Sequence, residues 1–252
     1  PDGQRPGSST VDDLIDWRAS QTSFESLAAY SQISAAVSSD GIAAVRFSGA
    51  KITPNLLGQL RVAPAIGRGF VDADAQPGAP KVALIADSVW TVPFGRDPRI
   101  IGRIVRLNGE ATEIIGVMPP KFGFPQVAAV WTPLVIQPAE VRSESPRVSV
   151  IGHLKPGVSE RAANTALAAI AARLAAAHTE NKNVGAAMQP FVRGALGSEV
   201  IGVLSAMLAA VFGVLLIACV NVTNLQLARA AARTREIGIR MAMGALRSRL
   251  IR

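Results

Sequence analysis

The sequence predicts an α+β domain, in one or two lobes, that is followed by a transmembrane α-helix and a short cytoplasmic helix. Three observations predict this fold class. Short amphipathic helices alternate with strand-like runs through residues 1–199. An uninterrupted apolar stretch covers residues 200–220, and most of the excess positive charge follows it. We therefore expect domains at residues 1–197, 198–228 and 229–252.

The composition excludes several classes of protein. Of the 252 residues, 49% are hydrophobic and 17% are charged, which is too apolar for a disordered chain and high for a soluble domain. The single cysteine, Cys219, excludes an internal disulfide framework and a Cys-rich zinc site. Nucleic-acid binding is not favoured either, because the arginine-rich tail contains no aromatic residue.

Local signals predict the first helix and the first hairpin. Thr10 and Asp13 have the spacing of a capping box, so a helix is expected to begin after Thr10. Residues 28–37 and 42–50 are strand-like runs, and the Asp40-Gly41 pair between them suits a tight hairpin turn.

The middle of the body is predicted to contain two short helices and a buried strand. Thr53 precedes Pro54, which is the usual order of an N-cap and a first helical residue. The apolar residues 81–86 predict a buried strand. Asp87 is then expected to cap the helix that carries Trp90.

The last elements of the body are a hairpin, a strand and a long helix. Residues 103–107 and 111–118 flank Asn108-Gly109, the strongest hairpin signal in the chain. Residues 147–154 predict a further strand. An alanine-rich amphipathic helix is expected from Ser159 to about His178, packed on the sheet.

Residues 200–220 predict a membrane span. A helix of this length covers about 30 Å, the thickness of the hydrocarbon core, and contains no charged side chain. The alternative is a buried core helix of a soluble protein.

The charge distribution predicts the orientation of this span. Residues 229–252 contain seven arginines and a single acid, so the positive-inside rule places them in the cytoplasm and residues 1–199 on the opposite side. No export signal is found in residues 1–20, so we expect the chain to be a fragment of a longer protein.

Small residues recur along one side of this span. Their spacing of three and four residues favours close packing against partner helices in lipid. The alternative is that glycine and alanine are simply common in membrane helices. The residues expected to pack are Gly202, Ala206, Ala210 and Gly213.

The tail is predicted to form a short helix with an apolar edge. Glu236 and Arg240 are spaced as a favourable i, i+4 pair, and Ile237 and Met241 share a neighbouring face. Gly244 is expected to end this helix. The alternative role is an amphipathic helix that lies on anionic lipid.

No catalytic, cofactor or metal site is predicted. His153 and His178 lack partners of the kind that metal ligands or catalytic dyads need. The Asp72-x-Asp74 pair could ligate a cation, although two such carboxylates in a loop are usually just solvated. This pair is the only feature of the sequence that supports a third hypothesis, a membrane-bound enzyme. The Walker lysine motif is absent, so we expect any ATPase activity on a partner chain or domain.

Many short segments, spread in order over most of the chain, carry one family pattern. They are residues 54–57, 60–70, 90, 94–95, 101–102, 107–109, 115–120, 154–158 and 215–240. These segments resemble the MacB/FtsX-type permeases of ABC transporters, specifically the MacB-like periplasmic core domain and the transmembrane helix that follows it. Two places depart from the family pattern: residues 56–57, where the family has aromatic residues, and Gln226, where an apolar residue is usual.

The resemblance implies a location and partners. It places the chain in the bacterial inner membrane, with residues 1–199 periplasmic and residues 229–252 at the start of an FtsX-like permease domain. The implied partners are a cytoplasmic ABC ATPase, a second permease copy present as a dimer or an internal repeat, and membrane lipid. A periplasmic adapter or outer-membrane component is a further partner of such permeases.

The resemblance also implies a mechanism without catalysis by this chain. ATP binding and hydrolysis by the partner would drive a periplasmic conformational change that exports a peptide, lipoprotein or antibiotic-like cargo. The alternative is an FtsX-like adapter or regulator of a cell-wall enzyme that transports nothing. By their position in the family, the ATPase-coupling residues would be Arg235, Glu236, Ile237, Gly238, Ile239, Arg240, Met241 and Gly244.

Overall fold

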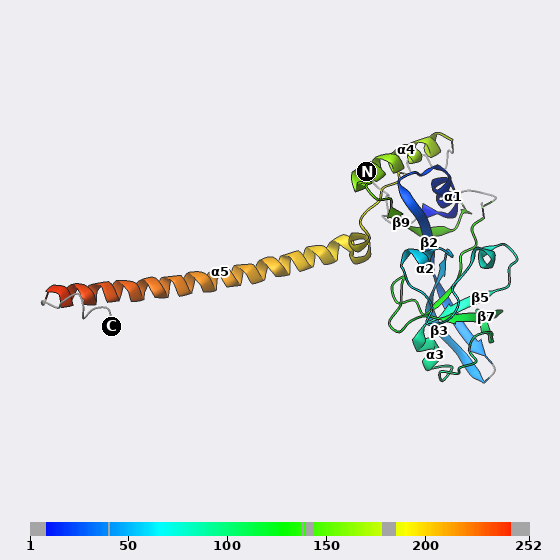
Figure 1. The fold of residues 1–252 in the computed structure, drawn as a ribbon, viewed down its shortest axis with the longest axis horizontal. Coiled ribbons are helices and arrows are strands. Elements are labelled where there is room, and N and C mark those ends of the chain that lie inside the picture. The colour runs from blue at the N-terminus through cyan, green and yellow to red at the C-terminus, as the bar shows by residue number, and fades with distance from the viewer. Residues whose placement is uncertain (1–8, 40, 138, 140–143, 178–184, 243–252) are drawn as a thin grey trace. The chain divides into compact units, whose positions relative to one another are not determined.

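A computed structural model describes residues 9–39, 41–137, 139, 144–177 and 185–242 (Figure 1). Within the last helix, only the backbone is described for residues 192–199, 201, 232, 235–237 and 240–242. The chain divides into two units, Pro1–Met188 and Gln189–Arg252, and each is described by itself.

The described part of the first unit contains nine strands and four α-helices. The strands are β1 (Ser9–Thr10), β2 (Phe24–Ser39), β3 (Ile42–Ile52), β4 (Ile66–Gly67), β5 (Val82–Ile85), β6 (Ile104–Leu107), β7 (Glu110–Val117), β8 (Val130–Pro133) and β9 (Arg147–Leu154). The helices are α1 (Val11–Ser20), α2 (Leu56–Gln59), α3 (Asp87–Thr91) and α4 (Glu160–Ala177), with a 3-10 turn at Asp72–Ala75.

Six of these strands pair in a closed ring. The order is β2, β3, β8, β5, β7 and β6, and β6 pairs back to β2. The pairs β3 with β8 and β5 with β7 are parallel, whereas the others are antiparallel. Closure leaves few open edges in this part of the sheet. Three strands lie outside the ring: β9 pairs with β2, β1 pairs with β9, and β4 pairs with β7.

Two hydrophobic cores confirm that the body has two lobes. The first lobe contains α1, α4, β1, β9 and the start of β2, and its core includes Leu14, Phe24 and Leu167. The second lobe contains the ring, α2 and α3, and its core includes Trp131 and Ile114. The long strand β2 belongs to both lobes and runs between them in Figure 1.

Both predicted hairpins are confirmed. β2 and β3 pair antiparallel, and Gly41 adopts the positive φ of 78° that the turn requires. β6 and β7 pair antiparallel around Asn108 and Gly109, which have φ values of 52° and 88°. The predicted capping box also forms, because Thr10 Oγ1 accepts from Asp13 N and Asp13 Oδ2 accepts from Thr10 N. β9 has the predicted bounds.

Two predicted helix caps are wrong. α2 begins at Leu56, with Asn55 as its N-cap, because the Thr53 side chain is used elsewhere: its hydroxyl accepts from Ala29 N at 3.0 Å. α3 has Ala86 at its N-cap, and the Asp87 carboxylate pairs with Arg96 instead of the helix end. In both cases a tertiary partner outcompetes the local hydrogen bond.

The second unit contains one long helix, α5 (Phe191–Ala242), of 52 residues. At 1.5 Å per residue it is about 78 Å long. The expected short cytoplasmic helix is not a separate element, because α5 continues through the tail to Ala242. Alanine and arginine are good helix formers, and one glycine, Gly238, costs only about 1 kcal/mol inside a helix. Gly244 lies outside the described residues.

Candidate functional site

The helix α5 contains one stretch, Gly202–Ala231, that is long and apolar enough to cross a membrane. None of its most apolar part is buried within the structure. Large apolar side chains such as Val211, Leu216 and Ile217 are more than 60% exposed. A core helix of a soluble protein would bury these side chains. The described residues therefore give no support to the core-helix alternative.

The small residues of this stretch share one helix face. Successive residues are rotated by 100°, so Gly202, Ala206, Ala210 and Gly213 lie within an arc of about 80°. A Cβ atom added at Gly202 or Gly213 would meet nothing within 4 Å. This face is therefore open to close approach by another helix.

Asn221 and Asn224 extend this face, which the sequence analysis did not recognise. Their rotation places them within an arc of about 100° that also holds the small residues. The signal was present in the 3.6-residue period of the sequence. The nearby hydroxyl of Thr223 is satisfied within α5, because it donates to Cys219 O at 2.8 Å.

The predicted coupling residues lie at the end of α5. The backbone of residues 235–241 is helical, and Ile239 is 53% exposed. A Cβ atom at Gly238 would meet nothing within 4 Å. The side chains of Arg235, Glu236, Ile237, Arg240 and Met241 lie outside the described residues, so the predicted pair and apolar edge stay predictions.

The Asp72-x-Asp74 pair does not form a cation site in the described structure. Arg68 holds both oxygens of Asp74, with N–O distances of 2.6 and 3.0 Å. The amide of Val71 also donates to Asp74 Oδ2 at 2.9 Å. The Arg68 hydrogen bond lowers the pKa of Asp74 from its ordinary value. The Asp74 carboxylate therefore holds Arg68 and the backbone of Val71 together in this loop.

The remaining polar candidates also have structural explanations. His153 Nδ1 lies 3.1 Å from Glu25 Oε2 on the surface. His178 lies outside the described residues. Across the residues that the structure does describe, no group of three or more His, Cys, Asp or Glu side chains could hold a metal ion.

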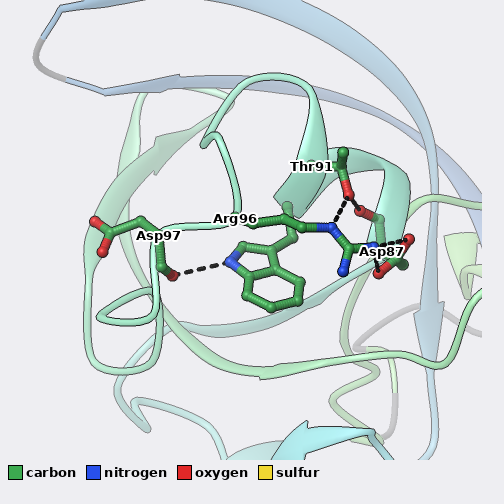
Figure 2. A network of polar contacts seen from close by, with 5 residues as sticks. Asp87, Thr91, Arg96 and Asp97 are labelled. Atoms are coloured by element: carbon green, nitrogen blue, oxygen red, sulfur yellow. Dashed lines mark hydrogen bonds and ion pairs between the residues drawn. The ribbon is translucent and has the colours of Figure 1, made fainter.

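A polar network around Trp90 was missed by the sequence analysis (Figure 2). Arg96 donates to both oxygens of Asp87, at 2.8 and 3.1 Å, and to Thr91 Oγ1 at 3.1 Å. Its guanidinium also lies over the Trp90 ring, 5.1 Å from the centroid. Trp90 Nε1 donates to Asp97 O at 2.9 Å. The network fixes the loop after α3, because it ties Arg96 and Asp97 back to residues of that helix.

Comparisons with known proteins agree with this architecture. The family model of the MacB-like periplasmic core domain matches residues 1–170. Two relatives, both named macrolide export ATP-binding/permease protein MacB, from Neisseria gonorrhoeae, are 28% identical over 191 residues. These residues are 73% of this chain but 28% of each relative, so the chain spans under a third of their length.

Solved structures share the fold at low sequence identity. A domain of a permease protein from Porphyromonas gingivalis has a TM-score of 0.53 at 16% identity, covering 66% of this chain and 71% of that one. The extracellular domain of the ABC-type transporter YknZ from Gram-positive bacteria scores 0.51 at 17%, covering 69% and 87%. The periplasmic region of MacB from Actinobacillus actinomycetemcomitans scores 0.51 at 14%, covering 70% and 77%.

The family model covers most of the two-lobed body, and the solved periplasmic domains have the same mixed α/β fold. With the apolar helix that follows the body, this matches a membrane-bound permease component. The chain belongs to the family of the MacB-like periplasmic core domain of ABC transporter permeases.

Proposed function

We propose that this chain is part of a MacB-type permease that couples ATP binding and hydrolysis by a cytoplasmic ATPase to a periplasmic conformational change. The conformational change exports a peptide, lipoprotein or antibiotic-like cargo. The ATPase activity resides on a partner chain or domain, and a second permease copy completes the assembly.

The continuity of α5 supports this proposal best. A bilayer core of about 30 Å accounts for less than half of the roughly 78 Å length of α5. No proline interrupts the helix between Phe191 and Ala242. A displacement applied at the arginine-rich end is therefore carried along one helix, without a break at the membrane surface.

The arginine-rich end of α5 is the proposed contact with the ATPase. Ile237 and Met241 lie one turn apart, so they share one side of the helix. Their apolar side chains would seat in the surface of the ATPase, with Glu236 and Arg240 beside them. The ordinary alternative, an anionic lipid surface, would bind the arginines without requiring an ATPase.

The test replaces both apolar residues with Asp in the intact transporter. Ile237→Asp combined with Met241→Asp should abolish the permease's stimulation of ATP hydrolysis, because burying two carboxylates in an apolar contact is strongly unfavourable. Ala232→Asp is the matched control, since it lies on the opposite side of the helix. Unchanged stimulation in the double variant would contradict the proposal.

A regulator of a cell-wall enzyme is separated from a transporter by a second measurement. Purified transporter in vesicles is supplied with ATP, and cargo release is measured beside binding of a cell-wall hydrolase. Release of cargo supports the proposed function. Hydrolase binding with no release would replace it with the regulator.

A further inference from the structure

The two lobes meet along a short section of β2. Leu27 and Ala29 are buried in the core of the first lobe, whereas Ala28 is buried in the core of the second lobe. Tyr30 packs against the second core from the same face as Ala28. Because side chains alternate along a strand, this section of β2 is the layer between the two cores. A change in the angle between the lobes would therefore act on β2 at this section.

The pairing of β2 with β3 ends at this section. Thr53 donates its amide to Ala29 O at 2.9 Å and accepts from Ala29 N at 3.0 Å. Backbone groups along one edge of a strand belong to every second residue, so Leu27 O is the next acceptor on this edge. β3 has no residue left to satisfy it.

Side chains from both lobes bind this carbonyl oxygen. Arg18, from α1 of the first lobe, donates to Leu27 O from Nη2 at 2.7 Å and from Nε at 3.2 Å. Asn55, which caps α2 of the second lobe, donates to the same oxygen from Nδ2 at 3.1 Å. Arg18 Nη2 also lies 3.4 Å from Asn55 Oδ1, so the two side chains bond directly.

Further contacts surround this cluster. Gln59 of α2 donates to Ser26 Oγ, one residue before Leu27. Partial burial lowers the pKa of Arg18, and the negative charge of Asp72 in the second lobe acts in the opposite direction. The first lobe therefore contributes the cationic side chain of Arg18 to this cluster. The second lobe contributes Asn55, whose side chain both donates and accepts, and the negative charge of Asp72.

We propose that Arg18 and Asn55 form a latch that fixes the angle between the two lobes. With the latch closed, the body moves as one piece when α5 is displaced, a consequence that rests on the proposed function. With the latch broken, β2 bends between Leu27 and Ala29, and displacement of one lobe is lost before it reaches the other.

Distances between spin labels test the latch. In a Cys219→Ala background, Ala169→Cys on α4 and Val92→Cys after α3 place one nitroxide on each lobe, at exposed positions. The full chain in lipid nanodiscs should give one narrow distance distribution. Arg18→Gln and, separately, Asn55→Ala should each broaden or shift it, because each removes the contribution of one lobe.

Arg106→Gln is the matched control, since Arg106 is exposed and its side chain donates to the nearby Gly109 O, far from Leu27 in the sequence. Intrinsic tryptophan fluorescence checks that each variant is folded. If Arg18→Gln does not fold, Asn55→Ala carries the test, because the Arg18 bonds to Leu27 O remain in it. An unchanged narrow distribution in a folded latch variant overturns the proposal. The measurement needs no ATPase, so its result is independent of whether the chain takes part in transport.

Discussion

Gly116 offers a direct test of how the ring of strands is packed. It lies in β7, opposite Leu84 of β5 on one side and Gly67 of β4 on the other. A Cβ atom at this position would lie 2.7 Å from Arg68 O, 2.8 Å from Leu84 Cδ2 and 3.2 Å from Ile66 O. Two of these three atoms are backbone oxygens, which cannot rotate away. Gly116→Ala must therefore push β4 off β7.

The expected cost follows from these contacts. Overpacking of this kind costs about 1–3 kcal/mol, and weakening a backbone hydrogen bond such as Arg68 N to Ile115 O adds about 1 kcal/mol. Replacing glycine stabilises by roughly 0.5–1 kcal/mol through the unfolded chain. The net loss in the free energy of unfolding is about 1–3 kcal/mol. For a body of this size the Tm should fall by roughly 2–12 °C.

Thermal unfolding in detergent, followed by tryptophan fluorescence, measures this effect. The three tryptophans, Trp17, Trp90 and Trp131, all lie in the first unit, so the signal reports only on the body. Gly58→Ala is the matched control, because a Cβ atom there meets nothing within 4 Å and α2 gains a better helix former. A Tm of Gly116→Ala equal to or above that of the unmodified chain would refute the described packing of β4 on β7.

Three further predictions concern the loop, the core and the membrane helix. The hydrogen bond from Arg68 lowers the pKa of Asp74 in the folded protein. The Arg68–Asp74 ion pair therefore contributes fully to the free energy of unfolding above the ordinary value of 3.8, and this contribution is lost as the pH falls through the lowered pKa. Asp74→Asn should therefore lower the Tm at pH 7, and this difference in Tm should shrink as the pH is lowered below 3.8. A difference that stays constant would count against the ion pair. Trp131→Phe should lower the free energy of unfolding, measured by urea titration, by about 2–4 kcal/mol, because Phe124 O loses its donor at 2.7 Å and the fully buried site is left with a void. One hydrogen bond alone is worth about 1 kcal/mol, so a loss below about 0.5 kcal/mol would contradict this prediction. Ala206→Leu with Ala210→Leu should weaken association of the span in a membrane two-hybrid assay, whereas Val211→Leu on the opposite side should not; equal signals would argue that the small face is not an interface.

The sequence was sufficient where the signals are local. Asn108-Gly109 and Asp40-Gly41 identify hairpins because the turns need residues that tolerate positive φ. The capping box at Thr10 and Asp13 is also a contact within four residues. The apolar stretch in α5 needs no tertiary information, since length and composition alone decide whether a helix can span a bilayer.

The sequence was insufficient where partners lie far apart along the chain. The ring closes through β2 and β6, whose paired residues Val37 and Leu107 are distant in sequence and carry no pairing signal. Asp87 does not cap α3, because its carboxylate pairs with Arg96. The contact between Arg18 and Asn55 joins residues 37 positions apart. Such contacts are determined by tertiary packing, which overrides local preference.

The proposed function requires the arginine-rich end of α5 to lie on the opposite side of the membrane from the body, and labelling of single cysteines tests this orientation. In a Cys219→Ala background, Arg161→Cys reports on the body and Thr234→Cys on the arginine-rich end of α5. A membrane-impermeant maleimide is applied to right-side-out vesicles, and then to vesicles opened with detergent. Arg161→Cys should be labelled in both preparations, and Thr234→Cys only after the vesicles are opened. Labelling of Thr234→Cys in sealed vesicles would contradict this orientation.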